Sequence, residues 1–435
     1  MLRRTFVLME SEPAVNFRLQ SAPLALAVLF ALQASSAMGD NLTYQAGLDP
    51  KVGYNIWDPY KHTEDSQRLV NQVNAMKAAG MHEVSFLPFA YADMTTGQIK
   101  QDWAGDTFGS MTDAELTAGI QRAKQLGMKV TVTPLIQKRN SGSGRDEIVF
   151  TPSTAPGQTF WNDYKTNYTR WANVAQAAGA DRLNIGSEMT GLDNNAANAV
   201  AWTDVINATD AAFTGQLGYT TQHWTFAEPA IKNMIWTNAK IDYISVSAYP
   251  TYQPEYNKPG LASTAQAAGQ ASDSQAFINT VRDNFTDFLD DTLLPLSTEL
   301  NKPLIIGEFG VTPFDGASTI PYKWWYSVDP NDPNFIPYDP LEQKNVWEGV
   351  LRALDGQAAQ IEAIHAWIWG WDGGFGGEQF YMRPGAADVL PSWFDESQSA
   401  PASSLISNFA SGTLPEPGAM ILLVGLGAAA LRRRS

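Results

Sequence analysis

Short β-rich runs alternate with helical patterns along most of this sequence, and this alternation constrains the fold more than any other feature. Eight such runs occupy residues 53–57, 83–89, 129–136, 182–188, 221–226, 243–249, 304–308 and 363–369. Strands that alternate with helices form a parallel sheet, and eight repeats of the unit predict a closed (β/α)₈ TIM barrel, an α/β fold. A doubly wound open sheet is the alternative. It is disfavoured because no Gly-x-Gly-x-x-Gly motif follows the first run.

Helical patterns fill the intervals between these runs. They cover residues 66–79, 113–125, 160–178, 196–213, 274–289 and 341–357. Gly80, Gly127 and Gly179 each stand between a helical pattern and the next β-rich run. Because glycine adopts the left-handed conformation that often ends a helix, we expect these three residues to cap helices and turn the chain into the following strand.

The connections that follow the predicted strands are long. Residues 137–159, 250–273, 309–340 and 370–400 are irregular and rich in Pro, Gly and aromatic residues. The loops at the carboxyl ends of the strands form the active site of a (β/α)₈ barrel, so the sequence predicts a built-up cleft there. We expect one catalytic domain over residues 40–397, followed by a Ser/Ala-rich linker over residues 398–413.

The first 39 residues have the features of a secretory signal. Arg18 precedes an apolar run at residues 22–32, and small residues follow at 34–37. The apolar run is short for a permanent membrane span. A basic flank, a short apolar run and a small-residue cleavage region are typical of a signal peptide, so we expect residues 1–39 to direct export.

Residues 414–435 combine three features in a fixed order. A Leu-Pro-Glu-Pro-Gly motif at 414–418 precedes an apolar stretch and then three arginines at 432–434, which stay on the cytoplasmic side by the positive-inside rule. This order resembles the PEP-CTERM sorting tail of Gram-negative bacteria. The resemblance implies an exosortase-type sorting enzyme as a partner, transient insertion into the inner membrane, and a final location in the cell envelope or on the extracellular surface. A simple C-terminal transmembrane helix that stays as an anchor is the alternative.

Two glutamates end apolar strands. Glu188 follows Leu-Asn-Ile-Gly-Ser at 183–187, and Glu308 follows Leu-Ile-Ile-Gly at 304–307. A charge after a buried strand costs several kcal/mol if it is left unpaired, so two of them at one rim suggest a function. Strands four and seven face each other across the barrel mouth, where two carboxylates can flank one sugar ring. In retaining glycosidases such a pair lies about 5–5.5 Å apart and acts as nucleophile and acid/base. A structural ion pair is the alternative for either glutamate.

Over about residues 53–371 these motifs resemble the clan A glycoside hydrolases, and most of all family 113, whose known members include β-mannanases. The resemblance implies that Glu188 is the acid/base and Glu308 the nucleophile of a retaining enzyme that cleaves a β-1,4-mannan-like chain internally. The charge of Glu308 can keep Glu188 protonated by like-charge repulsion. Much of the clan has Asn-Glu where this sequence has Ser187-Glu188. Family 113 shares this departure, which leaves the contact to the sugar 2-hydroxyl unassigned.

Aromatic residues near the strand ends are candidates for substrate binding. In the same clan, a tyrosine at the position of Tyr249 holds the nucleophile ionised, and a tryptophan after strand eight forms a sugar platform. The alternation of side chains places Trp367, Trp369 and Trp371 on the same side of the strand. Of these three we expect the later two nearer the cleft and Trp367 in the core. Indole faces suit the C–H face of a pyranose. Further candidates at the first and fifth predicted strands are Trp57, His223 and Trp224, each with packing in the protein interior as the alternative.

Composition narrows the remaining functions. The 435 residues carry a net charge of −16, which disfavours nucleic acid as a partner. The chain has no cysteine, and its four histidines lack metal-ligand spacing, so we expect neither a metal nor a cofactor. Two alternatives to a mannan-cleaving enzyme stay open. One is a hydrolase of another β-glycan or of the producer's own exopolysaccharide, and the other is a non-catalytic glycan-binding barrel.

Overall fold

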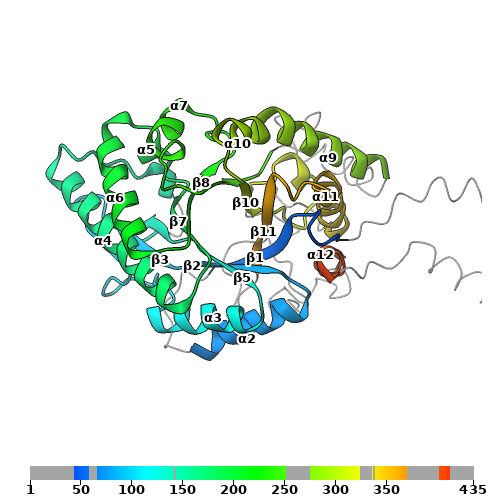
Figure 1. Cartoon of the computed structure of the whole chain (residues 1–435), viewed down its shortest axis with the longest axis horizontal. Helices are drawn as coiled ribbons and strands as arrows, with labels where there is room; N and C mark the ends of the chain where they lie inside the picture. Colours follow the sequence, from blue (N-terminus) through cyan, green and yellow to red (C-terminus); the bar gives the residue numbers. More distant parts are fainter. Residues whose placement is uncertain are drawn as a thin grey trace, which may run out of the picture. The chain divides into compact units, whose positions relative to one another are not determined.

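Eight parallel strands close into a barrel, which confirms the (β/α)₈ prediction (Figure 1). The computed structural model describes residues 44–57, 66–141, 144–250, 275–323, 336, 339–369 and 401–411. Around the barrel the strands are β1 (Lys51–Trp57), β11 (Ile361–Trp369), β10 (Leu304–Phe309), β9 (Tyr243–Ser247), β8 (Gln216–Gln222), β7 (Arg182–Ser187), β5 (Lys129–Val132) and β2 (Glu83–Leu87).

Helices surround the strands, and each of the six predicted helical patterns contains one. The long helices are α2 (Ser66–Ala78), α3 (Asp113–Gln125), α4 (Ala155–Ala178), α6 (Ala199–Ala212), α9 (Gln275–Phe288) and α11 (Pro340–Ala353). Shorter elements are α5 (Thr190–Asp193), α7 (Pro229–Ile231), α10 (Leu294–Leu300), α12 (Pro401–Ser411), and the irregular turns η1 (Arg145–Glu147), η2 (Ala196–Asn198), η3 (Lys232–Trp236), η5 (Leu289–Leu293) and η6 (Ala317–Thr319). Gly80, Gly127 and Gly179 have φ angles of 86°, 71° and 86°, as expected for the glycines that follow α2, α3 and α4.

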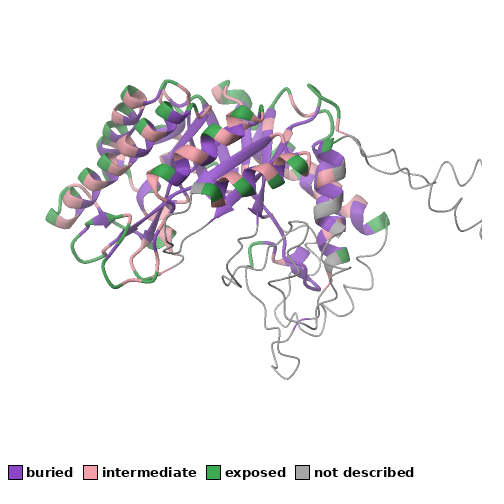
Figure 2. Ribbon diagram, turned by 90° about the horizontal axis from the view of Figure 1, so that it is seen from below, coloured by how far each residue is buried: buried purple, intermediate pink, exposed green. Residues whose placement is uncertain are grey.

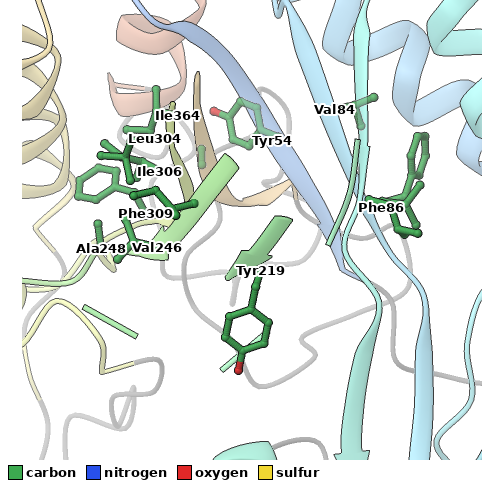
Figure 3. Close-up of a cluster of buried hydrophobic side chains, with 14 of the residues drawn as sticks. Tyr54, Val84, Phe86, Tyr219, Val246, Ala248, Leu304, Ile306, Phe309 and Ile364 are labelled. Carbon is green, nitrogen blue, oxygen red and sulfur yellow. The ribbon is translucent and has the colours of Figure 1, made fainter. Parts of the chain in front are cut away.

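The hydrophobic core fills the layer between the strands and the helices. Alternate strand residues pack in one continuous cluster, because successive side chains of a strand point to opposite faces. Figure 3 shows part of this cluster, with Tyr54, Val84, Phe86, Val246, Leu304, Ile306 and Ile364 among its labelled residues. Figure 2 shows the strands buried and the exposed residues on the outer faces of the helices.

The inside of the barrel carries a hydrogen-bonded polar layer. Tyr243 Oη donates to Asn184 Oδ1 (2.9 Å), and Asn184 Nδ2 donates to Thr133 Oγ1 (2.9 Å), which also contacts Ser85 Oγ (3.1 Å). The Tyr243 ring fills the space beside Gly218, where an added Cβ would lie 2.2 Å from it. These buried polar groups satisfy one another, and they give the strands a polar inner face below the catalytic end.

A small sheet extends the barrel at its catalytic end. β3 (Phe89–Ala92) and β6 (Leu135–Lys138) continue the directions of β2 and β5, and β4 (Ile99–Lys100) pairs antiparallel with β3. Pro88 and Pro134 stand at the two breaks, where a residue without an N–H interrupts the hydrogen-bond ladder. The second and third predicted strands are therefore each split into a barrel part and an extension.

Two segments differ from the expectation. The fifth strand was predicted at 221–226, but β8 begins at Gln216 and ends at Gln222. Residues 401–411, interpreted from composition as part of a linker, form α12 instead. Ala402, Ile406 and Phe409 of this helix are almost fully buried, and α12 packs on α11. The signal peptide and the sorting tail lie outside the described residues. Among the residues that the structure describes, no helix is long and apolar enough to span a membrane.

Candidate active site

Glu188 and Glu308 come together at the carboxyl end of the barrel. Glu188 directly follows β7, and Glu308 is the fifth residue of β10. Their side chains keep only 13% and 12% of their accessible surface, so both carboxylates are largely removed from water. Two acidic groups held this close in such a site need a positive neighbour or a shared proton.

Arg145 supplies that positive neighbour. Its Nη2 atom forms a short ion pair with Glu188 Oε2 and lies 3.9 Å from Glu308 Oε2. The guanidinium is 13% exposed and comes from η1, in the loop that follows β6. Because one nitrogen contacts both carboxylates, the two Oε2 atoms lie near each other, as the close carboxylate pair of a retaining glycosidase requires.

The turn that carries Glu188 also supports Arg145. After Glu188 the chain forms α5, which packs on η1. Gly191 lies at this contact, where an added Cβ would lie 2.5 Å from Ile148 O and 2.9 Å from Asp146 O. Only glycine allows the two backbones to approach this closely, so the positions of Arg145 and Glu188 are linked through α5.

Tyr249 holds the other carboxylate. It follows β9, and its hydroxyl donates a 2.8 Å hydrogen bond to Glu308 Oε1. His223 fixes the backbone of this tyrosine, because His223 Nδ1 accepts from Tyr249 N (3.3 Å) while His223 N donates to Ser247 O (3.2 Å). Burial lowers the pKa of His223 to about 4, so the ring is neutral at neutral pH and can accept through Nδ1. The structure thus gives His223 a supporting contact behind Tyr249.

An aromatic cluster lies beside this pair and includes two of the tryptophans. Trp57, Phe89, Tyr91, Tyr249 and Trp367 pack together, with Trp57 and Trp367 at 6.5 Å between ring centroids. These residues come from β1, β3, β11 and the end of β9, so the extension sheet contributes one wall. Trp57 is only 6% exposed, and a sugar could therefore contact it only over a small edge.

Trp367 and Trp369 of β11 belong to two different buried clusters, although the alternation of side chains predicts the same side of the strand for both. Trp369 is 3% exposed and packs against Tyr54 in the main hydrophobic core, so the expectation that it faces the cleft is wrong. The pairing of β1 with β11 shifts register between Tyr54 and Ile56, and a simple two-residue alternation does not hold across such an irregularity. Trp367 is buried, as expected, at 4% exposure, and it packs in the aromatic cluster that contains Tyr249. Trp371 lies outside the described residues.

Trp224 is the most exposed of the candidate platforms. It follows β8, keeps 56% of its accessible surface, and lies 6.4 Å from the ring of Tyr322, which is 55% exposed. Large aromatic side chains left in water at the rim of a site are typical of carbohydrate contacts. Tyr322 was not singled out in the sequence, because it lies in a long irregular loop with no strand to place it.

One group of carboxylates among the described residues has the spacing of a metal site. Asp315, Asp339 and Glu342 bring one oxygen each within 4.8 Å of one another. Glu342 accepts hydrogen bonds from Gly316 N and Ser318 N (both 2.8 Å), and Asp339 caps α11. Backbone donors thus already satisfy these oxygens in part, and the group orders the loop that follows β10.

Comparisons with known proteins agree with this geometry. The sequence model of glycoside hydrolase family 113 matches residues 57–372. The structure of the family 113 β-mannanase AaManA from Alicyclobacillus acidocaldarius, in complex with ManMIm, is 18% identical with a TM-score of 0.60, and covers 85% of this chain and 99% of that one. A complex structure of a family 113 β-1,4-mannanase is 17% identical with a TM-score of 0.60, at 83% and 98% coverage. The sequence matches no curated protein.

Proposed function

Because this chain belongs to glycoside hydrolase family 113, it is a retaining glycoside hydrolase of clan A, and we propose that its substrate is a β-1,4-mannan-like polysaccharide cleaved internally. The observation that carries the proposal for the site is the pair of carboxylates after β7 and in β10, contacted by one guanidinium. The proposal for the substrate is supported by the similar solved structures, which are family 113 β-mannanases.

In the proposed mechanism Glu308 acts as nucleophile and Glu188 as acid/base. A Glu308 oxygen forms a bond to the anomeric carbon while the glycosidic C–O bond breaks, and the proton of Glu188 moves to the leaving oxygen. Water then attacks the same carbon, its proton moves to Glu188, and the ester bond to Glu308 breaks. The hydroxyl of Tyr249 favours the ionised form of Glu308, because it donates to one carboxylate oxygen and leaves the other for attack.

Arg145 has a defined place in this scheme. Its guanidinium neutralises the carboxylates, which would otherwise repel each other. Glu188 must carry a proton to act as an acid, and a guanidinium pairs with the ionised form. The direct contact between Arg145 and Glu188 therefore suits the second step, in which Glu188 acts as a base.

The location of the enzyme is a separate proposal. The signal-like residues 1–39 and the tail at 414–435 support export of a glycosidase to the cell envelope or extracellular surface of a Gram-negative bacterium. The tail also supports recognition by an exosortase-type enzyme during transient insertion into the inner membrane. Mass spectrometry of the mature protein would show whether both ends are removed, and a full-length product in the cytoplasm would contradict the proposal.

Reducing-sugar release tests the substrate. The 40–414 fragment is assayed on β-mannan, glucomannan, xylan and β-glucans, with Glu308→Gln as the inactive reference. We expect release on the mannans only, with oligosaccharides of several lengths as early products of internal cleavage. Release on another β-glycan would replace the mannan assignment, and tight binding of an oligosaccharide without any product would favour the glycan-binding alternative.

Tyr249→Phe is expected to lower kcat by about 10- to 100-fold, the usual range for losing one hydrogen bond to a charged group. The phenylalanine ring keeps the packing on the aromatic cluster, so KM and thermal stability should change little. Steady-state kinetics on mannohexaose measures the effect. Tyr91→Phe is the matched control, because Tyr91 belongs to the same cluster but donates to Gly109 O. Equal losses in the two variants would show that packing, and not the bond to Glu308, is responsible.

A further inference from the structure

We infer that Tyr219 and Asp193 are positioning residues that hold the carboxyl group of Glu188 at the point where it exchanges its proton with the substrate. The inference rests on the proposed acid/base role of Glu188. Neither residue was predicted from the sequence, because neither carries a motif and both are fully buried.

The backbone at Glu188 needs external support. Glu188 has a φ of 54°, a left-handed conformation that residues with a Cβ adopt rarely and that often marks functional sites. Its own N–H donates to Thr220 O of β8 (2.8 Å). The next N–H, that of Met189, donates to the hydroxyl of Tyr219 (3.1 Å). Both amides of the turn are thus held by β8, one through the backbone and one through a side chain.

Asp193 completes this support from the other end of the turn. Its Oδ2 atom accepts a 2.5 Å hydrogen bond from the Tyr219 hydroxyl, and its backbone N–H donates to Met189 O (2.9 Å). Tyr219, Met189 and Asp193 therefore form a closed ring of hydrogen bonds around the residue after Glu188. The Tyr219 ring is itself wedged between Trp202 and Trp236, at 5.5 and 5.6 Å between centroids, so it cannot move without disturbing α6.

Asp193 is an unfavourable choice for stability alone. It is fully buried, and within the described part of the chain no hydrogen-bond partner reaches its Oδ1 atom. Burial raises the pKa of Asp193 to about 6, against the opposing effect of the Tyr219 hydrogen bond. A neutral amide would cost less to bury, but it would hold the Tyr219 hydroxyl by a weaker hydrogen bond than the carboxylate does. Asp193 lies on the turn that carries Glu188, two residues after Gly191, which contacts the loop of Arg145. A buried carboxylate that is unfavourable for stability at this place indicates a role in catalysis.

The test uses the dependence of the rate on the leaving group. Phenyl β-mannobioside needs a proton on its departing oxygen, whereas 2,4-dinitrophenyl β-mannobioside leaves without one, and the two share the same sugars. If Tyr219 positions the proton donor, Tyr219→Phe should lower kcat/KM for the phenyl substrate about tenfold and for the dinitrophenyl substrate less than about twofold. Loss of folding or of sugar binding would lower both equally.

Three further variants make the result decisive. Glu188→Gln is the reference and must show the same pattern more strongly; if it does not, the proposed role of Glu188 is wrong. Tyr164→Phe is the matched control, since Tyr164 is equally buried but its hydroxyl donates to Ile185 O of β7, whereas the Tyr219 hydroxyl bonds to Met189 N and Asp193. Asp193→Asn should repeat the Tyr219→Phe pattern with less risk to folding. If Glu188→Gln discriminates between the substrates while Tyr219→Phe and Asp193→Asn do not, the inference is overturned and the proposed function stands.

Discussion

Replacing Glu308 with Gln is expected to lower kcat on the preferred polysaccharide by at least about 10⁴-fold. An amide oxygen can still accept the hydrogen bond from Tyr249, so the side chain keeps its place, but it cannot form the ester with the anomeric carbon. Because the sugar contacts stay, KM should change much less than kcat. Steady-state kinetics with circular dichroism to verify folding would measure both.

Azide distinguishes the nucleophile from the acid/base. In Glu308→Ala the small anion can enter the space left by the carboxylate and attack from that face, which yields a glycosyl azide of inverted configuration. In Glu188→Ala azide instead attacks the glycosyl-enzyme from the opposite face, and the product keeps the β configuration. NMR of the two products assigns the roles without reference to rates.

Glu228→Gln is the matched control for the charge change. Glu228 lies near the end of β8 and precedes α7, half-buried, and its backbone N–H donates to Thr225 O. We expect near wild-type activity from it. A large loss in Glu228→Gln together with a small loss in Glu308→Gln would show that the nucleophile has been assigned to the wrong strand.

The barrel and the two glutamates could be predicted because their signals are local. A strand buried on its outer face has an apolar alternation, and a glycine that caps a helix marks the turn into the next strand. The predicted start of β8 is five residues too late, because its inner face carries Gly218 and Thr220. These residues belong to the polar layer of the barrel, so this part of the strand lacks an apolar pattern. The aromatic and β-branched residues that follow it, Trp224, Thr225 and Phe226, have the composition of a strand and led to the displaced prediction.

Arg145 could not be predicted because nothing local distinguishes it. It stands in a Ser- and Gly-rich loop without a strand to aim it, and its position depends on the contact of η1 with α5 far along the chain. Trp369 does not take its expected place because a register shift is invisible in the sequence. The Ser/Ala-rich composition of residues 401–411 predicted a linker, but the same small residues allow the helix α12 to pack closely against α11.

The amino end of the barrel holds a second charged network, which has a structural role. Arg182 forms ion pairs with Glu83 Oε2 (2.7 Å) and with Glu362, and His365 Nε2 lies 3.2 Å from the same Glu83 oxygen. Arg182 and Glu83 are fully buried, and they begin β7 and β2 at the end opposite the active site. Because the active site of such a barrel lies at its carboxyl end, a buried ion-pair network at the amino end serves stability and not catalysis.

Glu83→Gln is expected to lower the free energy of unfolding by about 3–5 kcal/mol at pH 7, because it leaves a buried guanidinium short of one partner. Burial alone would raise the pKa of Glu83, but the hydrogen bond from His365 and the charges of Arg182, His365 and Lys129 lower it to about 2. A carboxyl group whose pKa is lower in the folded state stabilises that state above its unfolded pKa, about 4.5, and loses the effect as the pH falls toward 2. Urea unfolding of both proteins between pH 7 and pH 3 would measure the difference.

The pH dependence separates this network from a simple loss of packing. The difference in unfolding free energy between wild type and Glu83→Gln should be constant above about pH 5. It should narrow below about pH 5, because acid first protonates the carboxyl of the unfolded wild-type chain and so favours unfolding. Glu299→Gln is the control: it removes an exposed ion pair with Lys232 and should cost about 0–1 kcal/mol at any pH. If the difference in unfolding free energy stayed constant down to pH 3, the shape of Glu83, and not its charge, would hold β2 to β7.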